Sequence, residues 1–103
     1  MTEASAAWPD LHDAVLGRTV LDWETGEVRF DGWVVGGRTF VIRGTGVSSL
    51  RCPREFPWGH SAHAWINEAP PPEVAAEGQR LELRLQTGDI VVATARAFAI
   101  EVG

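Results

Sequence analysis

The chain has 103 residues, a hydrophobic content of 45% and a net charge of −5, which together describe one globular domain that can bury a core without a metal or a disulfide. An acidic protein lacks the positive charge that drives broad binding to nucleic acids and anionic membranes, and the single cysteine excludes an internal disulfide. The first ten residues lack the basic and apolar regions of a signal peptide, and no apolar run reaches the ~20 residues of a membrane span, so we expect a cytoplasmic location.

The N-terminal half combines one helix signal with a series of strand signals. Residues 1–7 are small and polar, and we expect them to be frayed. Pro9 and Asp10 favour a helix start and Gly17 favours a stop, so the sequence predicts a short N-terminal helix over residues 9–16. Period-two patterns then predict strands at 19–23, 27–30, 33–35, 39–43 and 47–51, with turns at Thr25-Gly26, Asp31-Gly32 and Gly36-Gly37.

The C-terminal half continues the strand pattern after a proline-rich middle. Residues 61–67 are predicted to be extended, the proline triplet at 70–72 is a stiff spacer, and residues 73–77 fit a helical turn or a loop. Residues 80–86 alternate clearly, with Leu81, Leu83 and Leu85 inward, and strands follow at 90–94 and 98–102. Turn signals about every ten residues predict an all-β single domain over residues 1–103, an antiparallel sandwich or partly closed barrel of six to eight short strands.

Residues 52–67 concentrate the groups that can bind a partner or do chemistry. They hold the only cysteine, two of the three histidines and two of the five tryptophans. Exposed tryptophan near arginine is typical of protein-binding hot spots, and Trp58 lies in a proline-rich loop, whereas Trp23 and Trp33 lie in strand patterns and are interpreted as structural. The predicted binding residues are Arg54, Trp58, His60, Ser61, His63 and Trp65.

The same window offers a metal site or a nucleophile as a competing interpretation. Cys52, His60 and His63 supply three ligands, whereas a structural zinc ion takes four. Neighbouring arginines would lower the pKa of Cys52, but Pro53 follows it and has no backbone N–H to offer an oxyanion. A buried thiol and two loop or surface imidazoles explain these residues more simply, so no catalytic or metal-binding residue is assigned. No cofactor motif is present, and we expect no cofactor.

Two motifs resemble a family of small bacterial all-β proteins known as a domain of unknown function. In that family a Trp-Gly-x-Ser…Asn loop precedes a Gln-Ser-Gly-Asp hairpin; here Trp58-Gly59-His60-Ser61 leads to Asn67, and Gln86-Thr87-Gly88-Asp89 follows with Thr87 in place of serine. The resemblance implies that Trp58, Gly59, Ser61 and Asn67 form one structural unit, and it implies no catalytic residues. Some similar acidic β-proteins are immunity proteins that neutralise bacterial toxins.

The leading interpretation is a non-enzymatic protein-binding module, of the immunity type that inhibits a bacterial toxin, which uses the 52–67 loop. Its negative charge would accelerate association with a basic partner. The alternative is a small-molecule or metal-binding β-domain, catalytic or not, that uses Cys52, His60 and His63. The expected partner is another protein, not a nucleic acid or a membrane, and homo-oligomers through sheet edges are a third arrangement.

Overall fold

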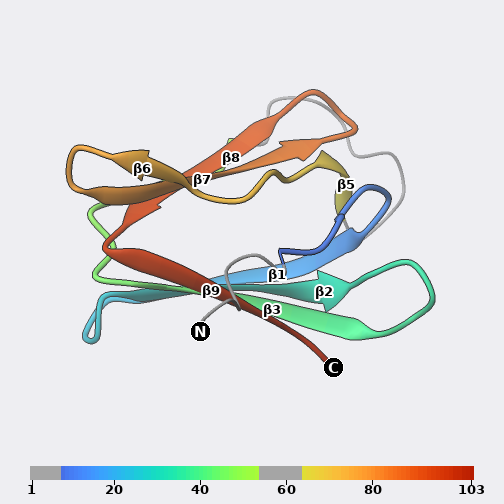
Figure 1. Cartoon of the computed structure of the whole chain (residues 1–103), viewed down its shortest axis with the longest axis horizontal. Coiled ribbons are helices and arrows are strands. Elements are labelled where there is room, and N and C mark those ends of the chain that lie inside the picture. The colour runs from blue at the N-terminus through green and yellow to red at the C-terminus, as the bar shows by residue number, and fades with distance from the viewer. Residues whose placement is uncertain (1–7, 54–63) are drawn as a thin grey trace.

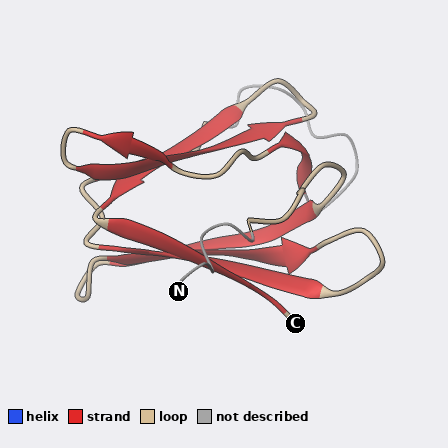
Figure 2. Ribbon diagram, in the orientation of Figure 1, coloured by secondary structure: helices blue, strands red, loops and turns tan. Residues whose placement is uncertain are grey.

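A computed structural model describes residues 8–53 and 64–103 of the chain (Figure 1). The frayed segment predicted at residues 1–7 lies outside the described residues. The described part contains antiparallel strands and no helix (Figure 2), and hence no helix able to cross a membrane. The nine strands are β1 (Val15–Asp22), β2 (Glu27–Trp33), β3 (Thr39–Thr45), β4 (Ser49–Arg51), β5 (Ala64–Glu68), β6 (Glu73–Ala75), β7 (Gly78–Leu85), β8 (Ile90–Ala95) and β9 (Ala97–Val102).

The sheet is all-antiparallel and open. Its strands follow the order β4-β8-β7-β5-β1-β2-β3-β9, and β6 pairs with β7 beside this path. Figure 1 shows two layers, with β1, β2, β3 and β9 in one and β6, β7 and β8 in the other. Strand β5 links them, because it pairs with β1 through its first residues and with β7 through its last. The all-β antiparallel prediction is confirmed, but the described strands number one more than the upper expectation and the sheet does not close.

The N-terminal helix predicted over residues 9–16 is wrong. Asp13 has a φ of 65°, which an α-helix does not accommodate, and the N–H of Ala14 closes a turn onto the carbonyl of Leu11 at 3.0 Å. Ile66 then donates to the carbonyl of Ala14 at 2.8 Å, and β1 begins at the next residue. Because Leu11 and Ala14 are each 1% exposed, burial against the sheet overrides the weak helix signals of this short segment.

Two further local predictions are wrong. The turn predicted at Asp31-Gly32 is the interior of β2, where Gly32 lies opposite Leu16 of β1 and Phe40 of β3. A Cβ at Gly32 would lie 1.8 Å from the carbonyl oxygen of Val15, so this glycine permits a close approach of backbones instead of a turn. The helical turn or loop expected at residues 73–77 contains β6, which pairs with β7.

The core lies between the two layers and follows the period-two pattern. Val28 and Phe30 of β2 and Ile42 of β3 are fully buried. Leu81, Leu83 and Leu85 of β7, predicted to face inward, are 1%, 0% and 4% exposed, which confirms that prediction. The remaining buried apolar residues of the core are Leu11, Ala14, Leu16, Phe40, Ala64, Ile66, Ala69, Val91 and Ala93.

The layers meet at a corner where β3 passes into β4 and β8 passes into β9. The backbone N–H of Arg96 donates to the carbonyls of Thr45 at 2.8 Å and Gly46 at 3.2 Å. Gly46 bends the chain there with a φ of 66°. One residue later, Val47 donates to the carbonyl of Gly26 at 2.9 Å, which attaches the β1–β2 turn to the same corner.

We expect Gly32→Ala to lower the free energy of unfolding by about 3 kcal/mol or more, because the added methyl collides with the backbone of Val15. Gly36→Ala is the matched control, since Gly36 has a φ of 101° and nothing within 4 Å of an added Cβ, so only backbone strain of about 1 kcal/mol applies. Urea unfolding of both variants measures the difference. Equal losses would contradict the close approach of β1 and β2.

Candidate functional site

Trp65 is the one predicted binding residue that falls within the described part of the chain. Arg54, Trp58, His60, Ser61 and His63 lie outside the described residues, so those assignments stay predictions. Trp65 lies on β5 and is 48% exposed, whereas its neighbours Ala64 and Ile66 point inward and are 2% and 0% exposed. The alternation of this segment therefore places the indole on the solvent face of the sheet.

Trp65 belongs to an apolar line across three strands, Trp65–Val15–Trp33, which we call the tryptophan row. Val15 of β1 lies opposite Trp65 of β5 on one side and opposite Trp33 of β2 on the other. Directly opposite residues of antiparallel strands share a face, with Cβ atoms about 5 Å apart. Trp33, interpreted as structural from the sequence, is 42% exposed. Its ring lies over Gly17, where a Cβ would come within 2.9 Å of the Trp33 Cζ3 atom.

Polar contacts fasten the end of the sheet that carries Trp65. The Nε2 of Gln86 donates to Oδ1 of Asp13 at 2.7 Å, and the N–H of Gln86 donates to the carbonyl of Trp65 at 2.8 Å. The Nδ1 of His12 lies 2.6 Å from the carbonyl oxygen of Asn67. The β7–β8 turn and the segment before β1 therefore hold β5 from both sides, which fixes the position of Trp65.

Cys52 is the described member of the alternative metal or nucleophile set. It is exposed and free, yet the surrounding protein desolvates the thiol enough to raise its pKa. This direction is opposite to the lowering expected from the neighbouring arginines, and it disfavours the thiolate that a nucleophile or metal ligand requires. Among the described residues no three His, Cys, Asp or Glu side chains are grouped to hold a metal ion, and His60 and His63 are not among those residues.

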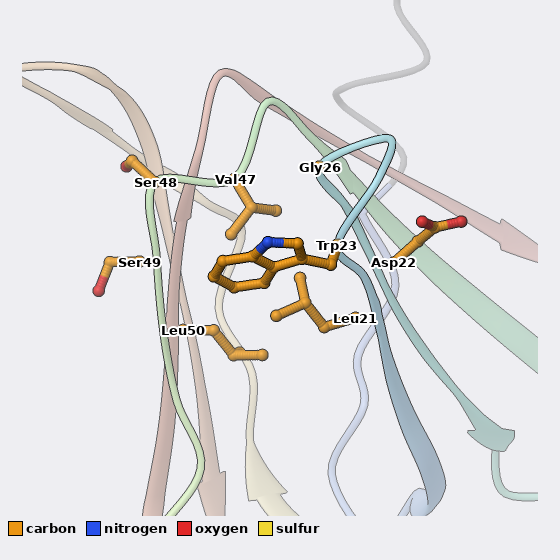
Figure 3. Close-up of a pocket in the computed structure, with 8 residues that line it drawn as sticks. All are labelled: Leu21, Asp22, Trp23, Gly26, Val47, Ser48, Ser49 and Leu50. Atoms are coloured by element: carbon orange, nitrogen blue, oxygen red, sulfur yellow. The ribbon is translucent and has the colours of Figure 1, made fainter.

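A second candidate site, which the sequence analysis missed, lies at the opposite end of β1. A pocket of about 310 Å³, which we call the hairpin pocket, separates the β1–β2 turn from β4 (Figure 3). Trp23 is 89% exposed here, so its interpretation as a structural residue is wrong. The only signal that could have revealed it is its position two residues before the Thr25-Gly26 turn. The pocket is lined by Leu21, Asp22, Trp23, Gly26, Val47, Ser48, Ser49 and Leu50.

No family model matches the chain, and neither a curated protein nor a solved structure matches it. Among the described residues, the tryptophan row and the hairpin pocket are the two surfaces that fit a binding partner.

We expect the stability of the protein to fall as the pH rises through the pKa of His12. The hydrogen bond to the Asn67 carbonyl, and then the charges of Asp13 and Asp10, raise that pKa above its ordinary value of 6.5. A raised folded-state pKa stabilises the fold fully below 6.5, and this stabilisation is lost above the folded-state value. His12→Gln keeps an N–H donor but does not titrate. Melting temperatures between about pH 5 and pH 8 should therefore depend less on pH in this variant, and an unchanged dependence would contradict the assignment.

Proposed function

We propose that the chain is a non-enzymatic protein-binding module whose binding face includes the tryptophan row. The observation that carries the proposal is the register of Val15, which places Trp33 and Trp65 on either side of it on one solvent face. Tryptophan dominates binding hot spots because a large rigid ring buries much area for little lost side-chain freedom. Both rings stand on paired strands, so the backbone beneath them is already ordered.

The surroundings of the row are those of an interface rim. Along the same face, Oδ2 of Asp31 forms ion pairs with Nε of Arg29 at 3.1 Å and with Nη2 of Arg18 at 3.5 Å. An apolar centre bordered by arginine and paired charges is the arrangement that protein interfaces adopt, with a desolvated middle and a polar edge. Asp31 offsets only one of these two arginine charges, and the apolar contact area of this face comes from the indoles.

The finer proposal is an immunity-type inhibitor of a basic bacterial toxin, acting in the cytoplasm. The net charge of −5 supports it, because opposite charge accelerates encounter with a basic protein. The resemblance of the Trp58–Ser61 and Gln86–Asp89 motifs to small bacterial β-proteins supports it as well. The predicted binding residues between 54 and 63 lie outside the described residues, and β5, which carries Trp65, is the next strand in the chain.

Trp65→Ala should raise the dissociation constant for the natural partner by about tenfold or more. The same change should lower the free energy of unfolding by only about 1 kcal/mol. The partner is first identified by affinity purification from the organism that encodes the chain, and binding is then measured by calorimetry with purified components. Val74→Ala is the matched control, because Val74 is 90% exposed on β6 in the other layer. Unchanged affinity of the Trp65 variant would remove the tryptophan row from the binding face.

A further inference from the structure

The turn that carries Trp23 is rigid. Oδ1 of Asp22 accepts the N–H groups of Glu24 at 3.0 Å and Thr25 at 3.2 Å, and the N–H of Gly26 donates to the Asp22 carbonyl at 2.9 Å. No contact that closes the turn involves the indole of Trp23. The ring is thus exposed to solvent on an ordered backbone, and a partner that covers it would not have to order the turn itself.

The hairpin pocket opens onto the edge of the core. Leu21 lies opposite fully buried Val28, and Leu50 lies opposite Ala93, which is 1% exposed. Both leucines therefore point between the layers, yet Leu21 remains 38% exposed because its neighbour across the gap does not cover it. Figure 3 shows these two side chains, Val47 and the indole of Trp23 among the residues that line the pocket. The volume of about 310 Å³ fits one or two large apolar side chains.

One wall of the pocket is an unpaired strand edge. Strand β4 pairs with β8 on one side, and in the described part of the chain no strand pairs with its other side. Ser49 and Leu50 of that strand line the pocket. An exposed edge accepts an extended peptide through backbone hydrogen bonds, and alternate side chains of such a peptide would point into the pocket.

The carboxylates of the β1–β2 turn favour a basic occupant on their side of the pocket, whereas the guanidinium of Arg96 lies over Gly46, next to Val47 of the other wall. On the outer faces of the two layers, Asp31, Glu68, Glu82 and Glu101 each form ion pairs with arginines. Within the described residues, no ion pair is formed by Asp22 or Glu24 of the turn or by Glu27 at the start of β2, so negative charge remains beside Trp23. A second copy of this chain is a poor occupant, because a symmetric contact around Trp23 would bring the same carboxylates of both copies together.

We propose that the hairpin pocket is a docking site for an extended segment of a basic partner protein. A large apolar side chain of that segment packs against Trp23, Leu21 and Leu50, and flanking lysines or arginines lie beside the carboxylates of the turn. This surface is separate from the tryptophan row. Val15 and Asp22 mark opposite ends of β1, about 20 Å apart at the usual rise of a strand.

The test uses a blocked Arg-Leu-Arg-Leu-Arg peptide as the probe and a blocked Glu-Leu-Glu-Leu-Glu peptide as its counterpart. In two-dimensional NMR of the full chain, the arginine peptide should shift the resonances of the Trp23 indole N–H and the Leu50 amide. Added salt should weaken binding of this peptide. Trp23→Ala should weaken binding about tenfold or more, and Glu24→Arg should weaken it several-fold. Both changes lie at exposed positions and should leave the melting temperature nearly unchanged.

Trp65→Ala is the matched control and should bind the arginine peptide like the unaltered chain, so failure of the tryptophan row and failure of this site are distinguishable. Three results would overturn the proposal. The first is equal binding of the glutamate peptide, and the second is undiminished binding by both the Trp23 and the Glu24 variants. The third is a concentration-dependent dimer in light scattering that disappears in Trp23→Ala, which would make a second copy the occupant.

Discussion

The hydrogen bonds between Arg96 and the carbonyls of Thr45 and Gly46 are the contacts on which the rest of the architecture depends. They bend two neighbouring stretches of chain at one point, so the β3–β9 pair lies in one layer and the β4–β8 pair continues in the other. A flat sheet of these strands would leave one apolar face in water. Folding it over at the corner brings the inner faces of both layers together and buries them as one core.

The same corner accounts for the hairpin pocket. Because the chain turns away at Gly46, β4 leaves the plane of β2 and β3, and the β1–β2 turn projects beyond the layer to which it belongs. The bond from Val47 to Gly26 ties that turn to the corner but leaves the space between Leu21 and Leu50 unfilled. An opening at this place is therefore a consequence of how the sheet is folded, and it does not depend on a loosely held loop.

Sequence periodicity predicted which residues face inward where alternation was unbroken, as at Leu81, Leu83 and Leu85. It failed where a residue has two uses. Glycine serves turns and close approaches alike, so Gly32 inside β2 looked like a hairpin turn. Period two also separates the faces of a strand without saying which face another layer covers, and the exposure of Trp33 and Trp65 on the outer face depended on that missing information. For Trp23 the decisive fact was the corner, a contact between segments distant in sequence.

Folding stability does not explain why tryptophan occupies position 23. The turn is closed by backbone groups and the carboxylate of Asp22, so a polar side chain would serve there equally well. An indole that is 89% exposed contributes little burial and adds apolar surface that favours unwanted association. At the other end of the same strand, Val15 lies between the partly exposed indoles of Trp33 and Trp65. The nearby carboxylate of Asp31 is paired there. Strand β1 thus joins an aromatic surface bordered by arginine to an acidic turn. Two surfaces that differ in charge in this way suit two different segments of a partner better than two copies of one segment.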